Sequence, residues 1–202
     1  MTATSEPAAA APEPARHSFV LPRTVALVGL MGVGKTTIGK RLAEHFELPF
    51  VDADEEIEKA AGQSIADIFA HYGETGFRDG EQRVIARLLE SPTQILATGG
   101  GALTHPLTRQ RLKAKAITVW LKTDLKVLAR RVANRPHRPL LKDRSPMEVL
   151  KEHAKNRYPL YEIADVTVDT GDQSHTRAVE MVLEALRSYL DTHPANTPGK
   201  PT

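Results

Sequence analysis

The chain has 202 residues, of which 41% are hydrophobic and 26% are charged, and these values are typical of a globular protein with one domain of ordinary size. The formal net charge of +2 at pH 7 is too small to favour a broad surface for nucleic acid or membrane. The chain contains no cysteine, which excludes disulfides, thiolate metal sites and cysteine nucleophiles.

Proline and small residues dominate both ends of the chain. Residues 1–22 and 191–202 have little to bury, so we expect disordered tails on either side of a single domain over residues 23–190. The side chains that carry charge before Arg16 are acidic, which disfavours a transit peptide. No apolar run approaches the roughly 20 residues of a membrane span. We therefore expect a cytoplasmic protein.

Between the tails, short apolar runs alternate with longer helical patterns. This alternation predicts an α/β fold, with a parallel sheet that is covered by helices on both faces. The expected strands are residues 24–29, 49–52, 94–100, 116–121 and 165–170. One helix is expected directly after Lys35. Further helices are expected over residues 54–61, 64–72, 75–90, 124–133, 146–157 and 175–190. Ser64 and Asp67 are spaced as in a capping box, which supports a helix start there.

Residues 29–36 match G-x-x-x-x-G-K-[ST] between the first strand and the first helix. Glycines allow a tight turn whose amides point at phosphate oxygens, Lys35 adds a positive charge, and the Thr36 hydroxyl can ligate Mg²⁺. The alternative is a glycine-rich turn without a ligand, which the flanking strand and helix disfavour. The predicted nucleotide-binding residues of this loop are Gly32, Val33, Gly34, Lys35, Thr36 and Thr37.

The nucleotide is expected to be ATP. A GTP-specific box would place an asparagine and a lysine after a later strand, and residues 121–124 are Leu-Lys-Thr-Asp here. Leu121 cannot hydrogen-bond a guanine. A cap formed by Thr123 or Asp124 for the next helix explains the segment better.

Two carboxylates and three glycines follow the second and third expected strands. Asp52 and Asp54 lie where ligands bind in open α/β sheets, so one can assist Mg²⁺ and the other can bond an acceptor hydroxyl. The structural alternative is that Asp52 ends the strand and Asp54 caps the next helix. The glycines, Gly99, Gly100 and Gly101, can offer bare amides to an acceptor or to a phosphate, and the alternative is a merely flexible turn.

Three arginine positions also point to an anionic substrate. Arg78 and Arg157 could grip a carboxylate through two-pronged contacts, although each could also be a solvated helix residue. Residues 130–144 carry five arginines and two prolines and predict a mobile cationic flap over ATP. A nucleic-acid patch is the competing interpretation of this segment.

The series GLMGVGKTTIGKRLA, FVDADEEIE, SIADIF, GFRDGE, TGGGA, RPLL and NRYPLY resembles the shikimate kinases, from about Val25 to Thr170. These P-loop enzymes transfer the γ-phosphate of ATP to the 3-hydroxyl of shikimate, in the biosynthesis of chorismate and aromatic amino acids. The resemblance implies a five-stranded parallel sheet in the order 2-3-1-4-5 with a mobile lid. It also implies Mg²⁺ as cofactor, shikimate and ATP as partners, and a monomer whose site lies within one domain.

The same resemblance implies roles for individual residues. Lys35 would contact the phosphates, Thr36 would bind Mg²⁺ directly, and Asp52 would assist through its water shell. Asp54 would bond the shikimate hydroxyls and accept the reacting proton, with Gly99, Gly100 and Gly101 lining the pocket. Arg78 and Arg157 would hold the shikimate carboxylate. Arg138 would reach the phosphates from the lid and so join Lys35 and Asp54 as a catalytic residue, and Arg131 would lie against adenine.

One departure concerns the adenine-binding turn, where many relatives have a proline and residues 171–175 have none. Two other functions also remain open. A related kinase of a carboxylate-bearing polyol, such as gluconate, could use the same arginine pair. A non-catalytic ATP-binding module would need the phosphate loop but no acceptor machinery.

Overall fold

The computed structural model describes residues 19–133 and 145–194 of the chain. Its sheet has five parallel strands in the order β2-β3-β1-β4-β5, which confirms the expected topology. The strands are β1 (Thr24–Val28), β2 (Phe50–Asp52), β3 (Ile95–Ala97), β4 (Ala116–Lys122) and β5 (Val166–Asp169). The central strand β1 is buried along its whole length, as its unbroken apolar run predicts.

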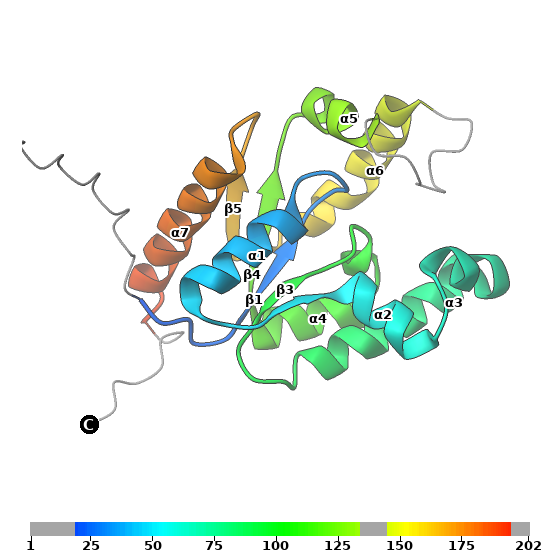
Figure 1. Cartoon of the computed structure of the whole chain (residues 1–202), viewed down its shortest axis with the longest axis horizontal. Helices are drawn as coiled ribbons and strands as arrows, with labels where there is room; N and C mark the ends of the chain where they lie inside the picture. The colour runs from blue at the N-terminus through cyan, green and yellow to red at the C-terminus, as the bar shows by residue number, and fades with distance from the viewer. Residues whose placement is uncertain (1–18, 134–144, 195–202) are drawn as a thin grey trace, which may run out of the picture.

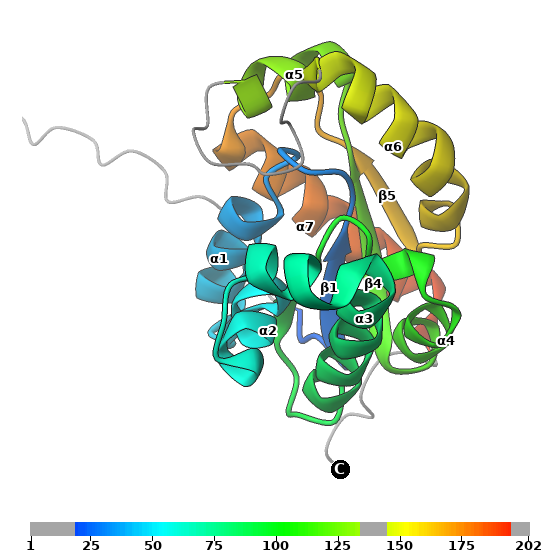
Figure 2. The same cartoon turned by 90° about the vertical axis from the view of Figure 1, so that its right-hand side faces the viewer.

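Helices cover both faces of this sheet (Figures 1 and 2). They are α1 (Lys35–Phe46), α2 (Ala53–Ala61), α3 (Ile65–Leu88), α4 (Pro106–Lys115), α5 (Leu125–Ala133), α6 (Pro146–Tyr161) and α7 (His175–Thr192), with a short 3₁₀ helix, η1 (Ala102–Thr104). Helices α1 and α7 lie side by side on one face, and α4 and α6 lie on the other (Figure 2). Helices α2 and α3 pack against each other beside the β2 edge, far from α7 (Figure 1).

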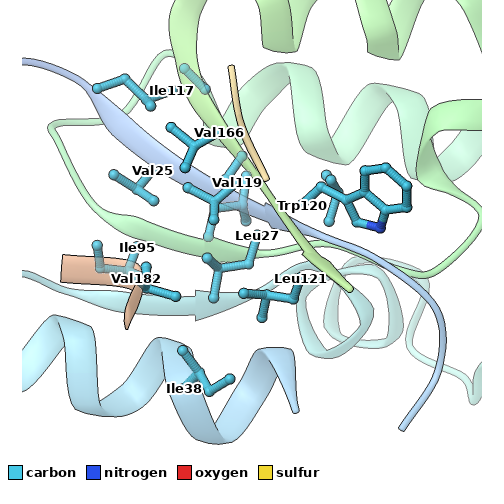
Figure 3. Close-up of a cluster of buried hydrophobic side chains, with 14 of the residues drawn as sticks. Val25, Leu27, Ile38, Ile95, Ile117, Val119, Trp120, Leu121, Val166 and Val182 are labelled. Carbon is cyan, nitrogen blue, oxygen red and sulfur yellow. The ribbon is translucent and has the colours of Figure 1, made fainter. Parts of the chain in front are cut away.

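The main core lies between the sheet and the helices of its two faces. Figure 3 shows Ile38 of α1 and Val182 of α7 close to sheet residues such as Leu27. These three side chains are almost completely buried. A smaller cluster around Ile57 and Phe77 joins α2 to α3. The α2–α3 unit therefore has an apolar contact of its own outside the main core.

The structure confirms the expected helices and differs most clearly at α4, which was not expected, and at α6 and α7, which are longer than expected. Gly73 has φ 67° and interrupts α3, which agrees with the two separate helices expected there. The Ser64 hydroxyl accepts a hydrogen bond from the Asp67 amide at 3.1 Å, which confirms the cap. No helix was expected over α4, because α4 buries only Thr108 and Leu112 and so lacks a wide apolar stripe.

Helices α6 and α7 are longer than expected. The sequence predicts an end at Arg157 because Pro159 lacks an amide hydrogen, but α6 continues to Tyr161 with the proline in its last turn. The carbonyl that the proline cannot bond belongs to Lys155, and both Lys155 and Pro159 are exposed residues. Helix α7 ends at Thr192, two residues beyond the expected limit.

Most of the two expected tails and residues 134–144 of the expected flap lie outside the described residues. Of the first expected tail, the Phe19 ring packs edge-on against Phe46 at 5.2 Å, and Leu21 is buried. Packed structure therefore begins before residue 23. Within the described ranges, no helix is both long and apolar enough to cross a bilayer.

Candidate active site

The loop between β1 and α1 has the backbone of a phosphate cradle. Gly29, Gly32 and Gly34 have φ of 140°, 81° and 99°, values that side chains other than hydrogen disfavour. Gly34 caps α1 without a side-chain hydrogen bond, and the first turn of α1 contains no acidic residue. The first amides of α1 can therefore bind an anion, helped by the helix dipole.

Lys35 lies across this loop. Its Nζ donates to the carbonyl oxygens of Gly29 at 2.8 Å and Leu30 at 3.1 Å. The predicted Val33 is buried in the core, and Thr37 is half-buried in the first turn of α1. The six predicted residues of the loop are thus brought together at one end of α1, with the ammonium group beside the cradle.

Thr36 and Asp52 form the arrangement expected for Mg²⁺. The Thr36 hydroxyl donates to Asp52 Oδ2 at 2.9 Å, and Asp52 Oδ1 accepts from the Asp54 amide at 3.0 Å. Two hard oxygen donors therefore meet beside the phosphate cradle, as Mg²⁺ prefers in kinases that complete its shell with water and phosphates. Among the described residues there is no cluster of three histidine or acidic side chains, which this kind of site does not need. Asp52 caps α2, so the alternative in which Asp54 is the cap is wrong.

A cavity lies between the phosphate loop, the turn after β3 and the α2–α3 unit. Its volume is about 150 Å³. Its lining residues are Met31, Asp54, Ile65, Phe69, Phe77, Arg78, Glu81, Gly99, Gly100, Gly101 and Arg157. All the residues predicted to bind the acceptor are among them. The structure thus gathers two carboxylates and two arginines from distant parts of the chain around the glycine turn.

The glycines of this turn are required because charged groups approach them closely. A Cβ atom on Gly99 would lie 2.8 Å from Asp54 Oδ1 and 2.7 Å from Glu81 Oε1. A Cβ atom on Gly101 would lie 2.1 Å from Arg78 Nη2. The interpretation of this segment as a merely flexible turn is therefore wrong.

Burial controls the electrostatics of the cavity. Desolvation raises the pKa of Asp54 above its ordinary value of 3.8, with a further rise from Asp52 and opposing effects from Lys35 and Arg78. Desolvation likewise raises the pKa of Glu81, although Arg78 lies 2.6 Å away and lowers it. Burial lowers the pKa of Arg157. Burial therefore opposes the charged form of all three groups.

Two residues of this site were not among the predicted site residues. Glu81 is 1% exposed and pairs with Arg78 through Nη1. Tyr161 is equally buried, and its hydroxyl donates to the Gly100 carbonyl. The spacing of Glu81 three residues after Arg78 on a helix was a signal for an ion pair. No local signal reveals the Tyr161 contact, because it joins two elements that are far apart in the chain.

At the other side of the phosphate loop, Arg130 and Arg131 approach the turn after β5. Arg130 Nη2 lies 2.7 Å and Arg131 Nη2 lies 3.8 Å from the Asp172 carboxylate. This turn contains no proline and leads to His175, whose ring lies beside Gly34. Asp124 Oδ1 accepts from the Lys126 amide at 2.6 Å, so the expected cap of α5 is confirmed. The predicted Arg138 lies outside the described residues.

The parallel sheet has helices on both faces, and its phosphate loop lies beside a small cavity that is lined by two arginines. These features define the class of P-loop kinases that act on small molecules. The family model described as shikimate kinase matches residues 31–187. A shikimate kinase of Caulobacter vibrioides is 56% identical over 82% of this chain and 82% of the relative, and one of Paramagnetospirillum magneticum is 50% identical over 84% and 87%. The chain belongs to the shikimate kinase family.

Solved structures agree with this assignment. A shikimate kinase from Acinetobacter baumannii in complex with shikimate has a TM-score of 0.78 and 38% identity, over 82% of this chain and 93% of that one. A gluconokinase from Sinorhizobium meliloti has a TM-score of 0.63 but only 20% identity, over 89% of this chain and 100% of that one. The likeness to the gluconokinase is one of fold alone.

Proposed function

We propose that the chain phosphorylates the 3-hydroxyl of shikimate with ATP, giving shikimate 3-phosphate and ADP, in chorismate and aromatic amino-acid biosynthesis. The observation that carries this reaction is the contact between the two halves of the site. A Cβ atom on Gly100 would lie 3.5 Å from both the Gly29 carbonyl oxygen and the Met31 amide nitrogen. An acceptor in the cavity would therefore lie next to a phosphate in the loop, as direct transfer requires.

The acceptor is held, in this proposal, by its carboxylate. Arg78 and Arg157 line one small cavity, and two guanidinium groups suit the planar geometry of a carboxylate. The amides of Gly99, Gly100 and Gly101 and the Asp54 carboxylate remain for the ring hydroxyls. The relative from Acinetobacter baumannii was solved with shikimate, which supports this choice of acceptor.

Asp54 is the proposed proton acceptor. As the shikimate oxygen bonds to the γ-phosphorus, the bond from that phosphorus to the bridging oxygen breaks, and the hydroxyl proton passes to Asp54 Oδ. The raised pKa of Asp54 makes its ionised form a stronger base than an exposed aspartate. The nearby Lys35 and Arg78 stabilise that ionised form.

The phosphates are held by the loop amides and by Lys35, which moves from the Gly29 and Leu30 carbonyls to the phosphate oxygens. Thr36 would hold Mg²⁺ directly, and Asp52 would hold it through water. When bound, Mg²⁺ supplies positive charge against the charge that builds up on the leaving phosphate. Arg131 is proposed beside adenine, and Arg138 is proposed to reach the transferred phosphate.

We further propose that a single chain is sufficient and acts in the cytoplasm. The side chains assigned to the acceptor cavity all come from one domain, whose packed structure extends from Phe19 to the end of α7 at Thr192. Light scattering in solution should therefore give the molar mass of a monomer.

A coupled ADP-release assay with ATP, Mg²⁺ and a panel of hydroxy-acids tests the function. Shikimate should give the fastest turnover, and chelation of Mg²⁺ with EDTA should abolish it reversibly. Faster turnover of gluconate would contradict the proposed acceptor. ATP binding without transfer to any acid would instead support a non-catalytic module.

A further inference from the structure

Tyr161 occupies an unusual position behind the acceptor cavity. It lies at the C-terminal end of α6, one turn after Arg157, and is 1% exposed. Its hydroxyl donates to the Gly100 carbonyl oxygen and shares a side-chain hydrogen bond with the Arg157 guanidinium. Since a guanidinium can only donate, the Tyr161 oxygen accepts from Arg157 while its proton goes to Gly100.

This hydroxyl therefore joins two groups that face the acceptor. Arg157 Nη1 would lie 3.4 Å from a Cβ atom on Gly100, so the arginine, the tyrosine and the glycine turn meet at one point. A carbonyl that is held from behind fixes the plane of its peptide. The amide of Gly101 belongs to the same peptide and is thereby fixed as well.

Tyr161 is an uncharged partner for Arg157, and this lack of charge matters for binding an acidic acceptor. Arg78 is paired with Glu81 at 2.6 Å, whereas no ion pair among the described residues involves Arg157. A carboxylate beside Arg157 would compete with an acidic acceptor for the guanidinium. The Tyr161 oxygen can orient Arg157 without neutralising it, and burial raises the pKa of Tyr161 so that it keeps its proton.

The ring of Tyr161 is itself held in place by aromatic packing. The Trp120 ring centroid lies 5.7 Å from that of Tyr161 and 5.2 Å from that of Tyr158. Tyr158 belongs to the same helix and cluster but is only half-buried. Removal of the Tyr161 hydroxyl alone would thus leave the ring supported by its neighbours.

We propose that Tyr161 is a positioning residue for the acceptor carboxylate, because its hydroxyl aligns Arg157 with the amides of the glycine turn. This inference rests on the proposed function, in which Arg157 binds shikimate. It predicts an effect on shikimate binding with little effect on ATP binding.

The test compares Tyr161→Phe with Tyr158→Phe, which removes a hydroxyl from the same aromatic cluster. Tyr161→Phe should raise the Kd and KM of shikimate about tenfold, the effect of a buried hydrogen bond to a charged group, while the KM of ATP changes less than twofold. Tyr158→Phe should leave both values within twofold. Calorimetry gives the shikimate Kd without turnover, and thermal unfolding verifies that both variants are folded.

A double-mutant cycle with Arg157→Ala separates positioning from general support. If Tyr161 acts through Arg157, Tyr161→Phe should have little further effect in the Arg157→Ala background, and additive losses would overturn the inference. An unchanged shikimate Kd in Tyr161→Phe would also overturn it, even where Arg157→Ala weakens binding and the proposed function stands. If Arg157→Ala itself changes nothing, or if shikimate does not bind the unaltered chain, the proposed function and this inference both fail.

Should Tyr161→Phe not fold, Arg157→Lys provides the test. A lysine keeps the charge but cannot contact the hydroxyl and a carboxylate in the same planar geometry. It should weaken shikimate binding at least tenfold, and unaltered affinity would overturn both the proposed carboxylate contact of Arg157 and this inference.

Discussion

Glu81→Gln should separate binding from stability. The substitution keeps the size of the side chain and an oxygen that can accept from Arg78, but it removes the buried charge at 2.6 Å. A hydrogen bond to a charged group contributes about 1.5–3 kcal/mol, and a tenfold change in affinity corresponds to about 1.4 kcal/mol. If this pair orients Arg78 for the acceptor, the Kd of shikimate should rise about ten- to a hundredfold.

Stability should respond differently. Deleting one partner of a buried ion pair commonly costs about 3–5 kcal/mol, but burial already opposes the charge on Glu81 and raises its pKa. The folded state therefore holds the Glu81 proton more tightly than the unfolded state. This contribution to stability is fully present below the ordinary value of 4.5 and is lost as the pH rises through the folded pKa. We expect the free energy of unfolding of the variant at pH 7 to stay within about 2 kcal/mol of the unaltered chain.

Calorimetry with shikimate and urea unfolding measure these two quantities. Glu74→Gln is the matched control, because Glu74 contacts the same Arg78 at 3.4 Å but is 68% exposed, and exposed pairs contribute about 0–1 kcal/mol. It should change shikimate affinity less than about fivefold. An unchanged Kd in Glu81→Gln, or a loss no larger than in Glu74→Gln, would refute the reasoning.

Three further predictions concern the phosphate loop, the glycine turn and the acid limb of the pH profile. Lys35→Ala should lower kcat about a thousandfold in the ADP-release assay without unfolding the chain, and full activity would contradict its phosphate role. Gly99→Ala should lower kcat/KM for shikimate at least tenfold by displacing Asp54, whereas Gly80→Ala, with nothing within 4 Å, should not. Because the pKa of Asp54 is raised and the base must be ionised, kcat/KM should fall on the acid side with an apparent pKa above 3.8, and a limb at or below that value would argue against Asp54 as the base.

Much of the nucleotide half of the site could be predicted from the sequence, because it is local. The glycine spacing, Lys35 and Thr36 all lie within one turn between a strand and a helix, where backbone geometry and residue type are directly linked. The carboxyl-edge position of Asp52 likewise follows from the strand that precedes it. Neighbouring parallel strands end at the same edge, so their end residues meet.

The rest depends on packing between distant segments. Helix α4 buries too few apolar residues to be recognised by periodicity, and α6 continues through Pro159 against the local preference of the backbone. Nothing near Tyr161 in the chain indicates that its hydroxyl reaches Gly100. The position of Arg157 in the acceptor cavity was expected from the family resemblance, since its helical context alone fits a solvated residue equally well.

The two halves of the site are built differently from the chain, and this difference has a consequence for how such enzymes can change their substrate. The phosphate cradle is formed by one short continuous segment, whereas the acceptor cavity is lined by residues of α2, α3, the turn after β3 and α6. Under the proposed function, changes to α2 and α3 beside the edge of the sheet should therefore alter the choice of acceptor and leave the phosphate loop unchanged.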